Sequence, residues 1–348
     1  MENYFTKLDY GRRFDNLKSR RFDESLNKAI LSESFNRSNF SKPLKYLFES
    51  MLPIEKNYNL VTIDAAEKVK KHLESRYDLH FSRDYEFQGS VMSNTNIKLY
   101  SDIDLLTIIG RYSFRPKHLI QTPYTASDPT EDIKSLRLQS ELIMEDVYDE
   151  VDTKGSKSIK ILNKSLRREV DIVFCFWNDT ENYLQFNEKD SRGVYLFDFP
   201  KEKKIEDFPF KHLEEVNNKG DQTNDGSRKG IRLLKTLKAD STREYENLSS
   251  FQLTTLVHQI HNSQLNYSFP GKEIDIARAM SFELEQVIAD KGYRQSIQSP
   301  NKSEFPFDDE DASLPDLKKL KEELDLLLID CGNDVDNIIR KGQKIVYS

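Results

Sequence analysis

The sequence predicts an α+β fold, with a small sheet backed by helices and then a lobe built of helices. Helical and strand-like segments alternate up to residue 199, whereas the segments after residue 226 have helical spacing throughout. With 348 residues, the chain is long enough to form two lobes. We therefore expect N-terminal helices and the sheet in residues 1–226, a helical lobe in 227–340, and a flexible tail in 341–348.

Apolar residues that recur every three or four positions predict the helices of the first part. After a polar start with one short helical candidate at 23–32, these helices are expected at 42–51, 62–77 and 131–150. Strands are expected at 84–88, 102–109, 158–162 and 168–176. The last two strands are close enough in sequence to pair as a hairpin.

The second part of the chain begins after a polar segment, 200–226, whose prolines and glycines predict loops. Helical spacing then predicts four helices, at 229–238, 249–262, 272–290 and 314–330. The intervening segment 299–312 contains two prolines and an acidic run, so we expect an exposed lid or linker there.

Composition excludes several classes of protein. No apolar run approaches the roughly 20 residues of a membrane-spanning helix, and the N-terminus lacks a signal-peptide pattern, so we expect a cytoplasmic protein without membrane association. Two cysteines are too few for a disulfide framework, and no Cys/His cluster has the spacing of a zinc site. Cys175 lies in an apolar strand and is expected to be a small core residue.

The net charge of -7 argues against a general nucleic-acid binder, because affinity for phosphates comes from Lys and Arg. We therefore expect no stable complex with double-stranded nucleic acid. Basic residues do cluster at 12–21 and at 201–204. We interpret both clusters as solvated faces or flexible ends rather than as binding surfaces.

Three aspartates point to a metal site. Asp102 and Asp104 are separated by one residue, so in a strand their side chains would share a face. Asp171, in a later strand, could join them or could form a salt bridge with Arg167 or Arg168. Burying such charges unpaired would cost several kcal/mol each, so a bound cation is the natural compensation. A few carboxylates together with substrate phosphates are the usual ligands of protein-bound Mg²⁺.

Gly89 and Ser90 directly follow a predicted strand, and eleven residues separate Ser90 from Asp102. A glycine lets backbone N–H groups approach phosphate oxygens, and a serine adds a hydroxyl donor at the same point. A Gly-Ser pair alone is an ordinary turn. Combined with the Asp-x-Asp strand, it indicates metal-assisted phosphoryl or nucleotidyl transfer.

This arrangement resembles the motif of the polymerase-β-like nucleotidyltransferases, which is Gly-Ser, a spacer, Asp-x-Asp and a third Asp on a nearby strand. The resemblance implies a nucleotidyltransferase palm with a helical C-terminal lobe, and an active site in the cleft. Asp102, Asp104 and Asp171 would bind two Mg²⁺ ions, for which Mn²⁺ can substitute. Gly89 and Ser90 would bind the terminal phosphates of the donor nucleotide.

Within that superfamily, the chain is similar to the bacterial cGAS/DncV-like nucleotidyltransferases (CD-NTases) over roughly residues 40–340, including segments 231–235 and 248–251. The resemblance implies that Lys235 neutralises triphosphate charge, Ser250 donates to a phosphate, and Phe251 stacks on a base. Alternatively, Lys235 is solvated, Ser249 or Ser250 only caps a helix, and Phe251 belongs to the core.

The resemblance also implies a function. The expected activity is synthesis of a cyclic dinucleotide or oligonucleotide from two nucleoside triphosphates, ATP or GTP, with release of pyrophosphate. The product, cyclic di-GMP or another purine product, would be a second messenger of bacterial antiphage (CBASS) signalling, read by a separate effector protein. We expect a monomer. Two alternatives stay open: a linear, template-independent nucleotidyltransferase acting on RNA, protein or a small molecule, and a catalytically inactive nucleotide-binding scaffold.

Overall fold

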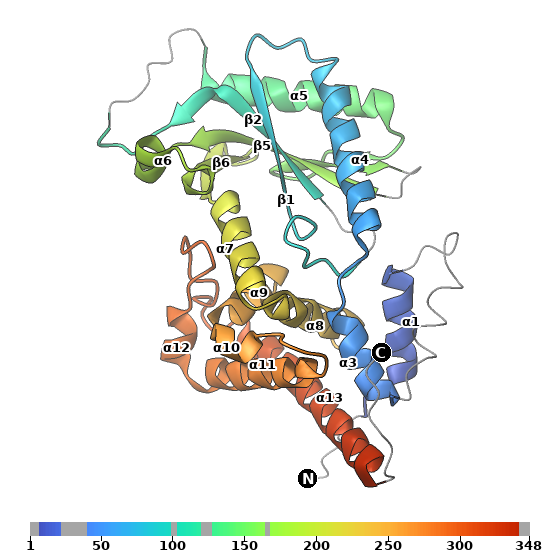
Figure 1. Cartoon of the computed structure of the whole chain (residues 1–348). Helices are drawn as coiled ribbons and strands as arrows, with labels where there is room; N and C mark the ends of the chain where they lie inside the picture. The colour runs from blue at the N-terminus through green and yellow to red at the C-terminus, as the bar shows by residue number, and fades with distance from the viewer. Residues whose placement is uncertain (1–6, 22–39, 99–102, 120–126, 164–167, 341–348) are drawn as a thin grey trace. The chain divides into compact units, whose positions relative to one another are not determined.

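The computed structural model describes residues 7–21, 40–98, 103–119, 127–163 and 168–340 (Figure 1). The chain forms two compact units. The sheet unit comprises Glu55–Asn94 and Tyr100–Glu215, and the helical unit comprises Met1–Ile54, Thr95–Leu99 and Val216–Ser348. The predicted boundary after residue 226 falls inside the helical unit.

In the part of the chain that the structure describes, the sheet unit has seven strands in the order β1-β2-β5-β4-β3, with β6 pairing with both β5 and β7. Strands β2 and β5 are parallel and the other pairs are antiparallel, including the predicted pairing of β4 with β5. The strands are β1 Arg83–Gln88, β2 Ile103–Phe114, β3 Val151–Asp152, β4 Ser158–Asn163, β5 Arg168–Asn178, β6 Gly193–Asp198 and β7 Lys203–Asp207.

Helices α4 (Lys56–Glu74) and α5 (Pro129–Val147) cover one face of this sheet (Figure 1). Val69 of α4 and Leu136 of α5 belong to the same buried cluster as Leu105 of β2 and Ile172 of β5. A smaller cluster on the opposite face includes Leu106, Val173, Cys175 and Phe210. The sheet therefore has one face sealed by helices and another that is only partly covered by apolar packing.

Local sequence explains where α5 begins. Asp128 precedes the helix and its side chain accepts a hydrogen bond from Thr130 N at 2.8 Å, while Pro129 occupies the first turn. An acidic N-cap satisfies a backbone N–H group that has no partner within the helix, and proline is favoured in the first turn. Two short elements complete the unit, α6 Glu181–Phe186 and the 3₁₀ helix η1 Lys189–Ser191.

The helical unit packs its helices around one apolar core that includes Leu47, Leu234, Leu253, Met280 and Leu324. Helix α7 (Pro209–Gln222) begins in the sheet unit and ends in the helical one. The other helices among the described residues are α1 Tyr10–Arg21, α3 Lys42–Met51, α8 Gly226–Asp240, α9 Ser250–Gln259, α10 Asn262–Leu265, α11 Lys272–Ala289, α12 Lys291–Ser296 and α13 Leu314–Arg340.

Helix α1 corrects the interpretation of the first basic cluster as solvated or flexible. The Arg13 side chain is buried and forms an ion pair with Glu323 of α13, and Arg20 pairs with Asp240 of α8. Tyr46 of α3 donates to Asp240 Oδ2 at 2.8 Å. The interpretation was wrong because carboxylates from distant helices neutralise these arginines and allow α1 to pack against the unit.

One further prediction was wrong. Segment 200–226 contains β7 and α7 rather than loops, with Pro209 at the first position of α7, where proline is tolerated. Segment 299–312 has no helix or strand and carries many exposed residues, as predicted, but Phe307 is fully buried and Gln252 Nε2 donates to the Pro306 carbonyl at 2.8 Å. The helical candidate at 23–32 and the tail at 341–348 lie outside the described residues.

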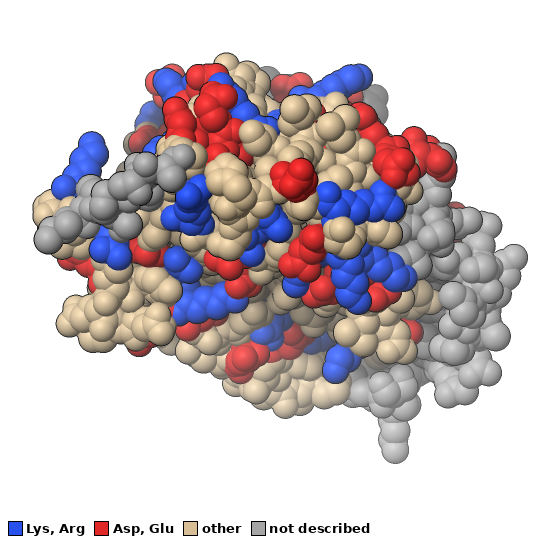
Figure 2. Space-filling view, turned by 90° about the horizontal axis from the view of Figure 1, so that it is seen from above, with Lys and Arg blue, Asp and Glu red and all other residues tan. Residues whose placement is uncertain are grey.

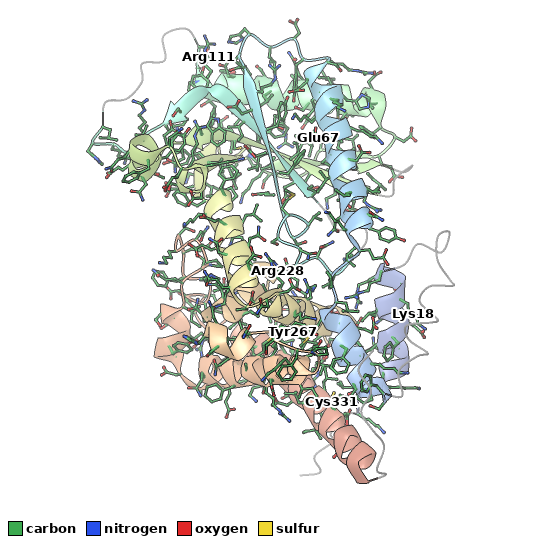
Figure 3. The ribbon with its side chains drawn as sticks, in the orientation of Figure 1. Lys18, Glu67, Arg111, Arg228, Tyr267 and Cys331 are labelled. Carbon is green, nitrogen blue, oxygen red and sulfur yellow. The ribbon has the colours of Figure 1, made fainter. Side chains whose placement is uncertain are left out.

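Both cysteines are free thiols in apolar surroundings. Cys331 lies on α13 in the core of the helical unit (Figure 3), and Cys175 is fully buried in the sheet, as predicted. Burial raises the pKa of the Cys175 thiol. None of the described helices combines the length and the apolar character that crossing a membrane requires. Acidic and basic side chains are interspersed over the face seen in Figure 2.

Candidate active site

The site begins with two aspartates in the central parallel strands. Asp104 lies in β2 beside the fully buried Ile103 and Leu105, and Asp171 lies in β5 beside the fully buried Ile172. Because side chains alternate along a strand, both aspartates point away from the face that α4 and α5 cover. Each carboxylate is partly exposed, so ions and substrates can reach it.

Strand register brings these residues into one row. Asp104 is the direct partner of Asp171 across β2 and β5. Gln88, the last residue of β1, lies opposite Asp104, and Lys160 of β4 lies opposite Asp171. Gln88, Asp104, Asp171 and Lys160, which we call the polar row, therefore cross four adjacent strands on one face of the sheet.

The donor set of this row fits a hard divalent cation. Asp171 Oδ1 is shielded from solvent, and two carboxylates on neighbouring strands repel each other unless a cation lies between or beside them. Carboxylate oxygens are the preferred ligands of Mg²⁺. Among the described residues no group of three His, Cys, Asp or Glu side chains gathers as a metal site would, and Asp102 lies outside those residues.

Lys160 and Glu169 were not anticipated from the sequence. Lys160 Nζ lies 3.8 Å from Asp171 Oδ1 and 3.2 Å from Glu169 Oε2. The predicted pairing of the last two strands could have identified them, because antiparallel register places a lysine between two apolar residues directly opposite Asp171. The structure thus adds one cation and one further carboxylate to the predicted cluster.

Gly89 and Ser90 form the turn that follows β1. Gly89 has a φ of 107°, a backbone conformation that favours glycine, and its carbonyl accepts from Met92 N at 3.1 Å. Because Gln88 is a member of the polar row, the turn begins at the residue that directly follows this row along β1. The structure therefore brings the predicted phosphate-binding pair next to one predicted metal ligand.

Lys235 lies on α8 in the helical unit and is not solvated, which excludes that alternative. Its residue is only 9% exposed, and Nζ donates to the carbonyl and hydroxyl oxygens of Thr95 at 3.3 and 3.4 Å. Burial, together with the nearby Arg232 charge, lowers the pKa of Lys235 to about 8. Thr95 follows Ser90 closely in sequence, so Lys235 contacts the segment that continues from the Gly-Ser turn.

At the start of α9, Ser249 rather than Ser250 caps the helix. Ser249 Oγ accepts from Gln252 N at 3.1 Å, and the Gln252 side chain accepts from Ser249 N at 2.8 Å, which together make a capping box. Ser250 is the exposed first residue of the helix, and Phe251 is half-buried and lies outside the buried apolar core. Ser250 therefore does not cap the helix, and Phe251 does not belong to that core.

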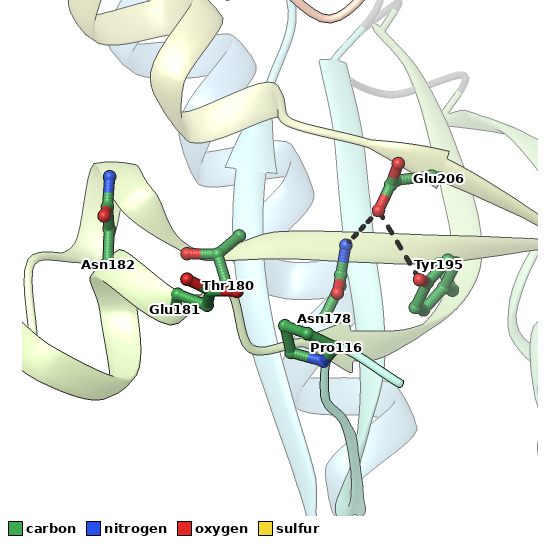
Figure 4. A pocket seen from close by; sticks show the side chains of 7 residues that line it. All are labelled: Pro116, Asn178, Thr180, Glu181, Asn182, Tyr195 and Glu206. Atoms are coloured by element: carbon green, nitrogen blue, oxygen red, sulfur yellow. Dashed lines mark hydrogen bonds between the residues drawn. The ribbon is translucent and has the colours of Figure 1, made fainter. Parts of the chain in front are cut away.

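A separate pocket of about 410 Å³ lies at the other end of the central strands (Figure 4). Asn178 and Tyr195 both donate to Glu206 Oε1 there, at 2.8 and 3.4 Å. Along β5, Asn178 is seven residues beyond Asp171, or about 23 Å in an extended strand, so this pocket is distinct from the polar row. Its lining residues are Pro116, Asn178, Thr180, Glu181, Asn182, Tyr195 and Glu206.

Comparison of the sequence with known proteins found relatives, although no family model matches. The chain is 34% identical over 252 residues to a cyclic dinucleotide synthase, CdnE, of Yersinia aleksiciae, covering 68% of this chain and 64% of that protein, which is just under two thirds of its length. It is 31% identical over 287 residues to a c-di-GMP synthase of a Lachnospiraceae bacterium, covering 73% of this chain and 80% of that protein.

Comparison of the structure gives the same result. The STING-associated CdnE c-di-GMP synthase from Capnocytophaga granulosa superposes with a TM-score of 0.79 at 29% sequence identity. The match covers 94% of this chain and 99% of that one. The likeness therefore extends over nearly the whole of both chains.

Proposed function

We propose that this chain, which belongs to the bacterial cGAS/DncV-like nucleotidyltransferases, makes cyclic di-GMP from two molecules of GTP. Membership makes it a nucleotidyltransferase and confirms the predicted α+β fold with a polymerase-β-like palm. The choice of GTP is supported by the product named for the Lachnospiraceae and Capnocytophaga relatives. The observation that carries the assignment of the site is the direct pairing of Asp104 with Asp171, next to the Gly89 turn.

Each of the two chemical steps forms one phosphodiester bond. A ribose hydroxyl oxygen attacks the α-phosphorus of a triphosphate, the bond from that phosphorus to its bridging oxygen breaks, and pyrophosphate leaves. Asp171 accepts the proton of the attacking hydroxyl, and Asp104 with Asp171 and Asp102 would hold two Mg²⁺ ions. When bound, these ions neutralise triphosphate charge and lower the pKa of the attacking hydroxyl.

The remaining site residues bind and orient the donor nucleotide. The positive φ of Gly89 turns backbone N–H groups towards a phosphate, and Ser90 adds a hydroxyl donor. Lys235 neutralises triphosphate charge, and Ser250 donates to a phosphate at the start of α9, where backbone N–H groups add to the attraction. Phe251 stacks on a base, which requires only an aromatic face.

We further propose that the product is a second messenger read by a separate effector in antiphage signalling. The Capnocytophaga relative supports this role, because it is a STING-associated c-di-GMP synthase. A soluble cyclic product would let synthase and effector act without direct contact.

Product analysis tests the proposal. The purified chain is incubated with Mg²⁺ and each nucleoside triphosphate alone, and with all four together, then treated with phosphatase and analysed by mass spectrometry. GTP alone should yield a phosphatase-resistant product with the mass of cyclic di-GMP. Extended ladders would instead indicate a linear nucleotidyltransferase, and the absence of any product would indicate a nucleotide-binding scaffold.

Lys235 predicts a pH dependence of substrate binding. Because its pKa is lowered to about 8, the ammonium group loses its proton, and its attraction for triphosphate, as pH rises above that value. The KM for GTP should therefore rise as pH increases through 8 and should be about tenfold higher at pH 9 than at pH 7. Each pH unit above the pKa lowers the protonated fraction of Lys235 by up to tenfold. Initial rates measured between pH 7 and 9.5 provide the test.

The Lys235→Arg variant is the control for this prediction, because arginine stays charged over the whole range and its KM should be nearly constant. Loss of stability at high pH would not explain a rise in KM. The unfolded chain keeps the Lys235 proton up to about pH 10.5, whereas the folded chain loses it near pH 8, so the contribution of Lys235 to stability grows with pH between these two values. A wild-type KM that is flat across pH 8 would contradict a role for Lys235 in triphosphate binding.

A further inference from the structure

We infer that Lys160 is a positioning residue that holds the Asp171 carboxylate in place before a divalent cation binds. Lys160 then competes with that cation for Asp171, and Glu169 weakens this competition by forming its own ion pair with Lys160. This inference rests on the metal site in the proposed function. It concerns only residues of the sheet unit that the structure places in contact.

Strand geometry puts the three side chains on the same face. Lys160 is the register partner of Asp171 across β4 and β5, and Glu169 precedes Asp171 by two residues on β5. Residues two apart on a strand share a face, so Glu169 and Asp171 both flank the lysine. The ammonium therefore lies between a predicted metal ligand and a carboxylate that has no assigned role.

The two distances are unequal. Lys160 Nζ is within hydrogen-bonding distance of Glu169 Oε2, at 3.2 Å, whereas 3.8 Å separates it from Asp171 Oδ1. The ammonium is thus bound more directly to Glu169 while its charge still reaches Asp171. Such an arrangement keeps a positive charge near the Asp104–Asp171 pair, with the ammonium closer to Glu169 than to Asp171.

Charge determines the sign of the expected effects. A positive charge beside Asp171 attracts the carboxylate and repels a divalent cation bound to it, so removing that charge should strengthen cation binding. Removing Glu169 should have the opposite effect, because Lys160 then loses the carboxylate that competes with Asp171 for its charge. Lys160 and Glu169 are 41% and 40% exposed at their side chains, so solvent screening limits both effects and the fold should tolerate both substitutions.

The experiment measures binding of Mn²⁺ to the full chain without nucleotide, from the electron paramagnetic resonance signal of the free ion. Lys160→Gln should lower the Kd for Mn²⁺ by about fivefold, and Glu169→Gln should raise it by a similar factor. In the double variant, the Glu169→Gln effect should shrink, because it acts through Lys160. Lys160→Arg should behave like the wild type.

Lys134→Gln is the matched control, since Lys134 has similar exposure and pairs with Glu202 on a different part of the sheet unit. Its Kd should not change. A Kd that is unchanged or raised in Lys160→Gln would overturn the inference, provided that Asp171→Asn weakens Mn²⁺ binding. If Asp171→Asn has no effect, or if the wild type binds no Mn²⁺, the metal assignment fails and the inference fails with it.

Discussion

The Asp171→Asn variant should lose cyclic product formation by about 1000-fold while keeping its fold. Asparagine has the size of aspartate but lacks the charge that binds a divalent cation and accepts a proton, and the loss of such an electrostatic group typically costs 10²- to 10³-fold or more. The residue lies directly opposite Asp104 in the central parallel pair, so no neighbouring strand supplies a substitute at that register position. The initial rate of formation of phosphatase-resistant product is the measurement.

Asp64→Asn is the matched control, because it makes the same chemical change on the exposed face of α4, where Asp64 forms an ion pair with Lys68 at 2.9 Å. Its rate should stay within about twofold of the wild type, since exposed ion pairs contribute little. Circular dichroism and the Tm of both variants separate loss of chemistry from loss of fold. An Asp171→Asn enzyme that keeps a tenth of the wild-type rate would contradict the assignment.

The strands that carry the site were predictable because their patterns are local. In β2 and β5, apolar residues flank each aspartate, and the alternation of a strand then places the aspartates on the other face. The pattern does not show which strands pair with each other. Strand order and register decide that Asp104 lies opposite Asp171, with Gln88 and Lys160 on either side.

Two features that the sequence did not predict, the burial of Arg13 and of Phe307, share a physical cause, namely that burial depends on partners far away in sequence. The arginines of α1 were interpreted as solvated because basic runs usually are, yet Arg13 forms an ion pair with Glu323, more than 300 residues later in the sequence. Segment 299–312 has the composition of an exposed loop, but Phe307 occupies the core of the helical unit. Composition alone cannot identify either partner.

Lys235 shows the same limit in the candidate site. Its position on α8 follows from helical spacing, whereas its burial against Thr95 and its lowered pKa depend on tertiary packing. The sequence left open whether it is solvated, and the structure decides that question. The sequence therefore predicts the candidate residue, while the structure supplies its environment.

The ion pair between Arg13 and Glu323 leads to a second large expected effect, this time on stability. Glu323→Gln should lower the free energy of unfolding by about 3–5 kcal/mol, because removing one partner of a buried ion pair leaves the other charge without compensation. Arg13 is 2% exposed, and its other contacts include the Tyr46 hydroxyl at 3.3 Å, which cannot neutralise a guanidinium. Glu323 also accepts from Ser241, a hydrogen bond that the amide oxygen of glutamine can keep, so the expected loss comes from the ion pair. Equilibrium unfolding in urea measures it.

Glu322→Gln provides the matched control on the preceding residue of α13. Glu322 pairs with Arg243 at the surface, where its side chain is 63% exposed, so its loss should cost less than about 1 kcal/mol. The two substitutions remove the same charge from adjacent positions and differ only in burial and partner. Equal effects would mean that the Arg13–Glu323 pair does not anchor α1, whereas a large difference would show that the basic cluster near the N-terminus serves the fold of the helical unit.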